Sequence, residues 1–358
     1  MDTLPLWALI LIFVLAAGVT WIAGIKLSET TDVLDERLHI GSAFGGLIVL
    51  AVATNLPEIA ITVSAAAAGH VEVAVGNILG GIAIQTVVIA LLDLLGRRGE
   101  GLKPLTYRAA SLTLVLEALV VVAVLAVVIS GSQLPSSLEV ARLTPDVVLI
   151  AALWVVGLVL VQRAGHGLPW HESGTAPEAT PHRQGHRRHQ QPKETERASV
   201  SPSTAKAATI FGSSALATLV AGVVLERSGD AASSHIGLSG VLFGATFLAL
   251  ATSLPEISTG LQAIRQGDDN LAMSDIFGGN AFLPVLFLVA TLISGKAILP
   301  GANASDIYLT ALAALLTLVY AVGLIFRPQR RIAGMGADSV TVVVLYLAGL
   351  AGLVAIAA

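Results

Sequence analysis

The sequence contains no cysteine and few charged residues. Cysteine is absent from all 358 positions, which excludes disulfides, thiolate metal sites and a cysteine nucleophile. Charged residues make up 12% of the chain, whereas a soluble protein carries about 25%. The net charge of -4 and the absence of a basic face argue against nucleic-acid binding. No HExxH, GxSxG or phosphate-binding loop is present, so we do not expect an enzyme.

Long apolar runs dominate what remains. Hydrophobic residues make up 55% of the chain, and a membrane-spanning helix needs about 20 apolar residues in succession. We predict an all-α polytopic membrane protein with ten transmembrane helices. The predicted spans are 4–24, 41–66, 72–95, 107–131, 146–162, 206–225, 238–264, 271–294, 304–326 and 338–357.

Positive charges are distributed unevenly between the loops. If the loops alternate across the membrane, one side collects 17 of the 20 Lys and Arg residues, and the other has only Arg142, Arg227 and Lys296. Cytoplasmic loops are enriched in Lys and Arg. We therefore expect an integral protein of the cell (inner) membrane, embedded in the lipid bilayer, with both termini outside and the long central loop in the cytoplasm.

That central loop, residues 164–205, is rich in His, Arg, Pro, Ser and Thr and has almost no large apolar residue. Such a segment cannot bury a core, so we predict a flexible cytoplasmic linker between an N-terminal unit, 1–163, and a C-terminal unit, 206–358. Its histidines leave two interpretations open, a metal-binding tract or a solvated basic linker near anionic lipid. They are His166, His171, His182, His186 and His189.

Two motifs recur at one fixed spacing. AVATNLPEIA begins at Ala51 and ALATSLPEIS at Ala249, while GNILGG begins at Gly76 and SDIFGG at Ser274; both pairs are offset by 198 residues. This offset shifts the chain by five predicted spans, and an odd shift inverts the second copy relative to the membrane. We predict two inverted five-helix repeats, an arrangement that places the substrate site near the midplane between the repeats.

The first motif concentrates polar chemistry inside an apolar segment. A proline within a helix lacks the backbone N–H, so Pro57 and Pro255 leave the carbonyl groups of Ala53 and Ala251 free. A carboxylate at the centre of a span costs about 2.5–3.5 kcal/mol, and two converging carboxylates would neutralise a divalent cation. Alternatively, the glutamates are protonated packing residues and the prolines ordinary kinks. The predicted cation-binding residues are Thr54, Asn55, Glu58, Thr252, Ser253 and Glu256.

The second motif supplies small residues for helix packing and several further polar candidates. Asp275 is either a proton or cation relay or an acid facing water near a helix end. The amides either coordinate ions or form interhelical hydrogen bonds. Glu117 has no acidic counterpart at the 198 offset, which reaches Leu315, and we place it outside the site. The secondary candidates are Ala53, Asn77, Gln85, Ala251, Asp275 and Asn280.

ATNLPEIAIT with GNILGG, and ATSLPEISTG with SDIFGGN, resemble the two alpha repeats of the calcium/cation antiporter superfamily, the sodium/calcium exchanger membrane region. The resemblance implies that Glu58 and Glu256 are the central Ca2+ ligands, with hydroxyl ligands beside them. The sequence also differs from the family pattern at several positions. Asn55 replaces a serine, Gly81 and Gly279 stand at serine positions, Ile82 replaces an asparagine, and Gln85 and Leu283 replace a final Asn or Asp; Asn280 is retained.

These departures remove oxygen ligands that the exchanger pattern uses around its Na+ sites. We predict an antiporter that exchanges Ca2+ or a related cation for Na+ by alternating access, and an H+-coupled exchanger is the alternative. A passive cation channel or a membrane scaffold would be functions of another class. The expected partners are inorganic cations, with no cofactor, and the sequence sets no oligomeric state.

Overall fold

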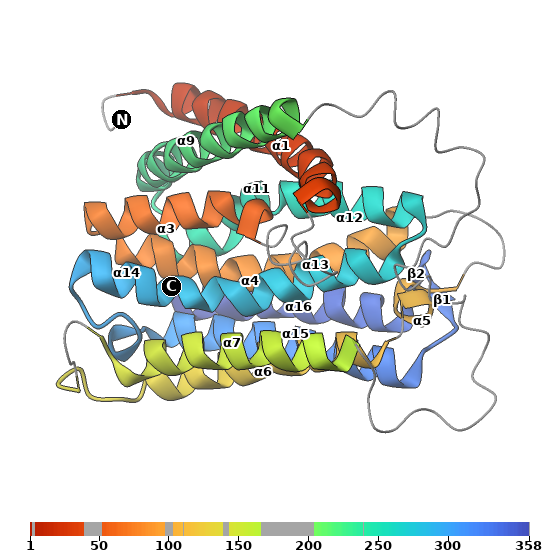
Figure 1. Ribbon diagram of the computed structural model, residues 1–358. Helices are drawn as coiled ribbons and strands as arrows, with labels where there is room; N and C mark the ends of the chain where they lie inside the picture. Colours follow the sequence, from red (N-terminus) through yellow and green to blue (C-terminus); the bar gives the residue numbers. More distant parts are fainter. Residues whose placement is uncertain are drawn as a thin grey trace.

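The computed structural model describes residues 1, 4–38, 52–96, 103–109, 111–138, 143–165, 204–238 and 240–357. Helices make up nearly all of this part of the chain and form a layered bundle (Figure 1). Most of the predicted linker, including its five histidines, lies outside the described residues, as does the first part of the predicted span 41–66.

The first half contains α1 (Leu6–Leu38), α3 (Leu56–Ala68), α4 (Val71–Leu95), α5 (Leu105–Ala109), α6 (Leu112–Gly131) and α7 (Pro145–Gly165). The second half contains α9 (Thr204–Ile236), α10 (Gly240–Phe243), a π-helical turn (Gly244–Leu248), α11 (Ala249–Thr252), α12 (Leu254–Gln266), α13 (Asp269–Phe282), α14 (Leu286–Ser294), α15 (Ala304–Phe326) and α16 (Ala337–Ala357). The 3-10 turns are Leu283–Val285 and Leu299–Gly301, and the antiparallel strands β1 (Arg331–Ile332) and β2 (Met335–Gly336) precede α16.

Eight helices in the described part of the chain are long and apolar enough to cross a membrane. They correspond to eight of the ten predicted spans. The predicted span 238–264 is instead divided into α10, the π-helical turn, α11 and α12. In the other exception, residues 52–54 are helical, the chain turns at Asn55, and α3 begins at Leu56. The helical membrane architecture is therefore confirmed. The described residues contain eight such unbroken helices, compared with the ten that the sequence predicts.

Proline explains both breaks. Pro57 and Pro255 are each the second residue of a new helix, α3 and α12. Proline is favoured in the first turn of a helix, where its missing N–H costs nothing, and it cannot donate to the carbonyl group four residues earlier, that of Ala53 or Ala251. The repeated Leu-Pro-Glu sequence thus begins a helix in each half and places a glutamate in its first turn.

The ends of the helices repeat along the chain. α1 and α9 both have 33 residues, and their first residues, Leu6 and Thr204, are separated by the same 198 residues as the sequence motifs. α3 and α12 both have 13 residues at that offset. α7 and α16 both have 21 residues, but Pro145 and Ala337 are offset by 192. The two halves therefore match element by element, with a shorter connection in the second half.

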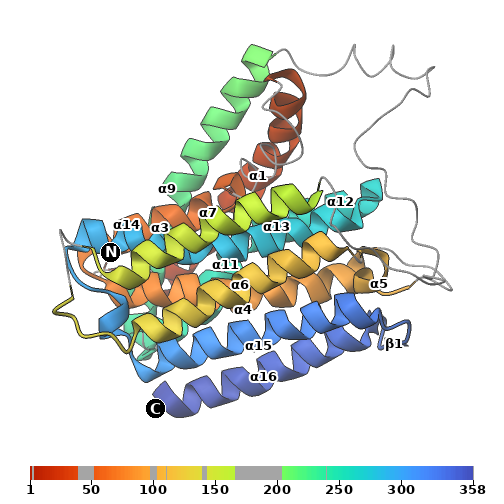
Figure 2. The same cartoon turned by 60° about the horizontal axis from the view of Figure 1, so that its bottom comes forward.

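α4 and the α13–α14 segment form the centre of the bundle, since 78% and 61% of their most apolar windows are buried. α1 and α9 pack against each other and cross over α3 and α12 at one side of the bundle, opposite α6, α7, α15 and α16 (Figures 1 and 2). The outer helices expose large apolar side chains, including Trp7 (70%), Leu216 (63%) and Leu347 (60%). An outer surface of this kind is typical of a protein surrounded by lipid.

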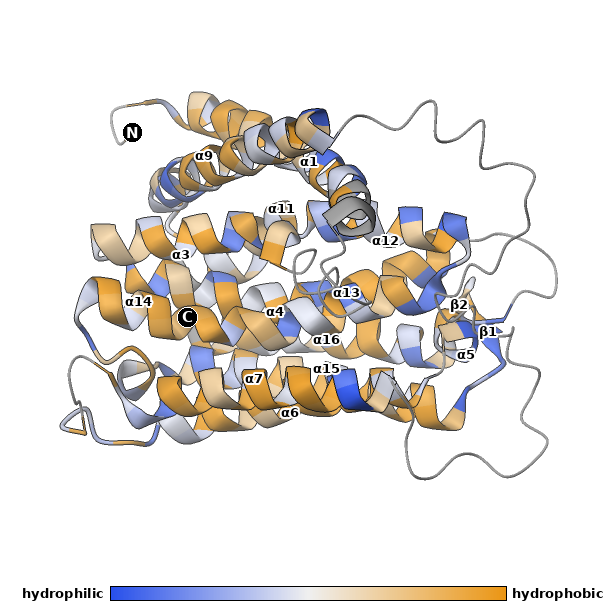
Figure 3. Cartoon of the chain, viewed as in Figure 1, coloured by the Kyte–Doolittle hydropathy of each residue, from blue (hydrophilic) through white to orange (hydrophobic). Residues whose placement is uncertain are grey.

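Hydrophilic residues gather at the end of the bundle that contains α5 and the two strands (Figure 3). Arg108 in α5, Arg327 at the end of α15 and Arg331 in β1 are among them. Arg108 Nη1 lies 2.5 Å from Asp269 Oδ1, and Arg327 Nη2 donates to the carbonyl oxygen of Tyr107 at 2.7 Å. Asp93 accepts hydrogen bonds from the backbone N–H groups of Leu105 (2.7 Å) and Gly336 (2.6 Å). These contacts fasten the α4–α5 connection to the strands that precede α16.

Candidate cation site

The two predicted glutamates lie at the start of the two interrupted helices. Glu58 is the third residue of α3 and Glu256 the third residue of α12, and their exposed fractions are 0% and 1%. The residues immediately before the two helices have nearly the same backbone angles, with φ -86° and ψ 11° at Asn55 and φ -80° and ψ 1° at Ser253. Each carboxylate therefore lies near a helix N-terminus, where the helix dipole favours negative charge.

Gln85 of α4 connects the two carboxylates. Its Nε2 donates to Glu58 Oε1 and to Glu256 Oε1, both at 3.4 Å. The remaining oxygens, Glu58 Oε2 and Glu256 Oε2, have no hydrogen-bond partner among the residues that the structure describes. The chain thus brings two carboxylates from opposite halves to one buried amide and leaves an oxygen of each available to a ligand.

Hydroxyl and carbonyl groups surround this pair. The Thr252 hydroxyl donates to the carbonyl oxygen of Ala249 at 3.2 Å. Ser253 Oγ donates to the carbonyl oxygen of Ala249 at 2.7 Å, so its lone pairs remain available as acceptors. Thr54, Asn55, Thr252 and Ser253 are all at most 1% exposed, and Ala53 and Ala251 are also buried. Such oxygen groups are the ligands that hard cations prefer.

The two glycines at the exchanger's serine positions have different surroundings. A Cβ atom on Gly279 would lie 2.9 Å from Asn55 Nδ2 and 3.6 Å from Gln85 Oε1. A Cβ atom on Gly81 would meet only Leu283 Cδ1, at 3.5 Å. The Asn55 side chain therefore lies where a side chain at position 279 would extend, so in this chain asparagine at 55 and glycine at 279 fit together.

The secondary candidates differ in their partners. Asp275 is only 4% exposed and accepts a hydrogen bond from Thr259 Oγ1 at 2.8 Å, so it does not face water in this conformation. Asn280 Nδ2 donates to Thr86 Oγ1 at 3.1 Å, an interhelical bond between α13 and α4. Asn77 is fully buried, and its amide atoms have no partner in the described part of the chain.

Two glycines next to the site were not identified from the sequence. A Cβ atom on Gly24 of α1 would lie 2.7 Å from Pro255 Cβ, and one on Gly222 of α9 would lie 2.8 Å from Ala60 Cβ and 3.0 Å from the Pro57 carbonyl oxygen. The positions differ by 198, the motif offset. Each glycine lets one half's first helix approach the other half's Pro-Glu turn closely, and its recurrence at that offset was the sequence signal that could have revealed it.

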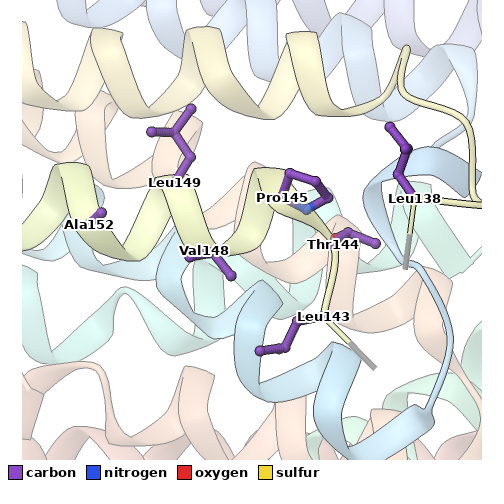
Figure 4. Close-up of a pocket in the computed structure, with 7 residues that line it drawn as sticks. All are labelled: Leu138, Leu143, Thr144, Pro145, Val148, Leu149 and Ala152. Atoms are coloured by element: carbon purple, nitrogen blue, oxygen red, sulfur yellow. The ribbon is translucent and has the colours of Figure 1, made fainter. Parts of the chain in front are cut away.

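A metal held by charged side chains alone does not fit the described residues, which contain no group of three or more His, Cys, Asp and Glu side chains suited to a metal ion. A cation at the glutamates would be held by two carboxylates together with neutral oxygens. An apolar pocket lies elsewhere, around the start of α7 (Figure 4), and contains no acidic residue. It is lined by Leu138, Leu143, Thr144, Pro145, Val148, Leu149 and Ala152.

Comparison with known families identifies the family of the chain. The model of the sodium/calcium exchanger protein family matches residues 7–163 and 206–355. The chain belongs to the sodium/calcium exchanger family. It is therefore an integral membrane protein of a family of ion exchangers, which are transporters rather than enzymes. The two matched segments leave out the residues between 163 and 206, where the sequence predicts the linker.

Two related proteins align with most of the chain. The chain is 29% identical over 288 residues to the putative antiporter CaxA of Alkalimonas amylolytica, covering 79% of this chain and 80% of CaxA. It is 24% identical over 267 residues to the inner membrane protein YrbG of Escherichia coli strain K12, covering 74% and 73%.

Solved structures show the same fold at low sequence identity. The H+/Ca2+ exchanger CAX has a TM-score of 0.62 and 11% identity, with 96% of this chain and 88% of that chain covered. The sodium-calcium exchanger NCX_Mj, soaked with Na+ and Sr2+, has a TM-score of 0.61 and 14% identity, with 97% and 99% covered.

Proposed function

We propose that the protein is a secondary antiporter that exchanges Ca2+, or a related divalent cation, against H+ by alternating access. The observation that carries this proposal is the convergence of Glu58 and Glu256 on Gln85, with one oxygen of each carboxylate left without a partner in the described structure. The family and the fold support Ca2+ as the cargo, as they include exchangers of H+ and Ca2+ and of Na+ and Ca2+.

Charge balance supports the proton as the coupling ion. The ion pairs among the described residues include neither glutamate, so no Lys or Arg compensates these buried carboxylates. Two carboxylates neutralise one divalent cation, and an uncompensated charge is costly at membrane depth. When the cation leaves, protons can neutralise the pair without any further ligand.

Na+ coupling, which the sequence predicts first, is the second candidate. The family description and the likeness to NCX_Mj favour it. The composition of the site weighs against it, because Gly81, Gly279 and Leu283 stand where the exchanger pattern supplies oxygen ligands. Na+ prefers such oxygen ligands, and glycine and leucine side chains offer none.

Alternating access requires two related halves, and the matched helix ends support them. α3 and α12 leave the centre of the bundle toward opposite ends (Figure 1). Both halves have an interrupted helix with the Pro-Glu turn at its break, so our proposal keeps ten membrane-crossing segments, two of them broken, as two inverted repeats. Non-helical breaks of this kind are tolerated at membrane depth where they line an ion site.

The orientation follows from the positively charged end. Arg108 belongs to α5, Lys103 lies two residues before it, and Arg331 begins β1. Both chain termini lie at the other end of the bundle (Figures 1 and 2). Since positive charge is retained on the cytoplasmic side, we place the α5 end in the cytoplasm and the termini outside the cell membrane.

The test is 45Ca2+ uptake into proteoliposomes that contain the full chain, under an outward H+ gradient or an outward Na+ gradient. We expect the H+ gradient to drive uptake above the level reached without a gradient, and Glu256→Ala to abolish it. Uptake driven only by Na+ would replace H+ with the second candidate. Uptake that merely follows the Ca2+ gradient, whatever the Na+ or H+ gradient, would identify a passive channel and reject both antiport proposals.

A further inference from the structure

Glu117 is a buried acid that the central site does not use. It lies in α6 with an exposed fraction of 8%, among the fully buried apolar side chains of Leu114, Ala118 and Val121. Ser274 Oγ of α13 donates to Glu117 Oε1 at 3.0 Å. Glu117 Oε2 has no partner among the residues that the structure describes. This carboxyl group therefore has a single neutral donor within an apolar core.

Several polar groups lie between this acid and the backbone of Glu256. Ser274 is followed in α13 by Asp275, which accepts a hydrogen bond from Thr259 Oγ1 of α12 at 2.8 Å. Thr259 Oγ1 also lies 3.2 Å from the carbonyl oxygen of Glu256. Neighbouring residues of a helix point about 100° apart, so α13 presents Ser274 to α6 and Asp275 to α12. The same helix thus contacts both the isolated acid and the central site.

The chemistry around Glu117 fits a proton and not a metal cation. A divalent cation such as Ca2+ takes six to eight oxygen ligands, whereas Glu117 has one hydroxyl group beside it. An ionised carboxylate that lacks both a cationic partner and sufficient donors is costly to bury. The neutral acid needs only an acceptor for its proton and keeps the bond that Ser274 donates.

We propose that Glu117 is a second proton-binding site, which takes up and releases one proton during the exchange cycle. This inference rests on the proposed H+ coupling and adds a residue to it. Thr259 of α12 contacts both Asp275 and the backbone of Glu256, so a shift of α13 that follows cation binding at Glu256 also changes the Ser274–Glu117 hydrogen bond. Cation binding at the centre is thereby linked to loss of the proton from Glu117.

The experiment measures proton release by the purified full-length protein in weakly buffered detergent solution, with a pH-sensitive dye, as Ca2+ is added. Glu117→Gln keeps the size of the side chain and an acceptor for Ser274 but has no proton to release. We expect the number of protons released per bound Ca2+ to fall by up to one. The slope of log Kd for Ca2+ against pH should become shallower by the same amount.

Ser274→Ala provides an independent variant, because it keeps the carboxyl group and removes its donor. We expect it to change the pH at which protons are released without changing their total number. A wild-type proton count and pH slope in Glu117→Gln, together with an unchanged pH of proton release in Ser274→Ala, would overturn the proposal and leave Glu117 as a packing contact between α6 and α13. If the wild-type protein binds Ca2+ without releasing any proton, the proposed H+ coupling itself fails, which separates the two results.

Discussion

The two halves of the molecule provide the same carboxylate but different neighbours for it. Glu58 and Glu256 have matching burial and matching backbone turns before them. The position that supplies the bridging amide Gln85 in α4 is occupied by the apolar Leu283 in the second half. The backbone geometry that places the charges is therefore duplicated, while the groups that tune the site come from one half or the other.

The acids and glycines away from the centre extend this comparison. Asp146 and Asp338 lie in the first turns of α7 and α16 at the 192 offset, and each lies close to a glycine of the preceding helix, Gly131 or Gly323. Glu117 breaks the pattern, because the same offset pairs it with the buried Leu309. The acids and glycines that recur in both halves thus belong to the shared helical framework. Glu117 has no acidic counterpart in the second half, as we expect of a residue with a separate function.

The most severe test removes one central carboxylate at a time. Glu58→Gln and Glu256→Gln each leave a single charge opposite a divalent cation, and we expect both to reduce Ca2+ exchange to the level of protein-free liposomes, a loss of more than about 100-fold. Such a loss corresponds to roughly 2.7 kcal/mol or more. Uptake of 45Ca2+ measures this, with correct folding checked by size-exclusion chromatography. A variant that kept a tenth of wild-type uptake would show that the halves are not equivalent.

The next largest effect concerns Gly279. Serine there would place Cβ 2.9 Å from Asn55 Nδ2, and such overpacking costs about 1–3 kcal/mol. We expect Gly279→Ser to lower Ca2+ uptake about 10-fold, and the double variant Asn55→Ser with Gly279→Ser to recover most of it. Gly81→Ser is the matched control, because its Cβ meets Leu283 at an ordinary contact distance of 3.5 Å.

Failure of the double variant to recover would mean that Asn55 has a role beyond filling the space next to Gly279. The same double variant restores two hydroxyl groups of the exchanger pattern. If those oxygens are what Na+ coupling lacks, an outward Na+ gradient should drive more uptake in the double variant than in the wild type.

A smaller effect is expected from two variants that make position 85 apolar and position 283 polar. Gln85→Leu removes a donor from both glutamates, and we expect Ca2+ affinity to fall about 3- to 10-fold, since the two hydrogen bonds are long at 3.4 Å. Leu283→Gln adds an amide to the other half and should change affinity less than about 3-fold. Ca2+ titration of the purified variants compares the two. Equal effects would contradict the assignment of the bridging role to Gln85 alone.

Much of this framework was accessible from the sequence, because hydropathy, charge distribution and the repeated motifs each follow a simple physical rule. The offset of 198 between Ala51 and Ala249 is reproduced by the ends of α1 and α9. The sequence could not show that Pro57 and Pro255 divide a predicted span into shorter helices, since proline in an apolar run is compatible with a kink or a break. Tertiary packing decides which of these two outcomes occurs.

Contacts between the halves were the least predictable part. Nothing along the chain indicates that Gly279 adjoins Asn55 or that Ser274 donates to Glu117, because these pairs are far apart in sequence and lack complementary charge. Gln85 was a secondary candidate, and only the fold shows that its amide lies between the two glutamates. The residues of the candidate site could be named from the sequence, whereas the contacts between them required the structure.

The smallest expected effect tests the turns that end α3 and α12. Gly69 and Gly267 have left-handed backbone, with φ of 84° and 88°, which costs an L-residue with a side chain roughly 1–2 kcal/mol. We expect Gly69→Ala and Gly267→Ala to lower the thermal midpoint by similar small amounts, about 2–4 °C, without changing Ca2+ uptake. Asparagine tolerates this conformation better, so Gly69→Asn and Gly267→Asn should lower it less. A clearly larger shift for one alanine variant would show that the equivalent turns differ in their contribution to stability, although their geometry is the same.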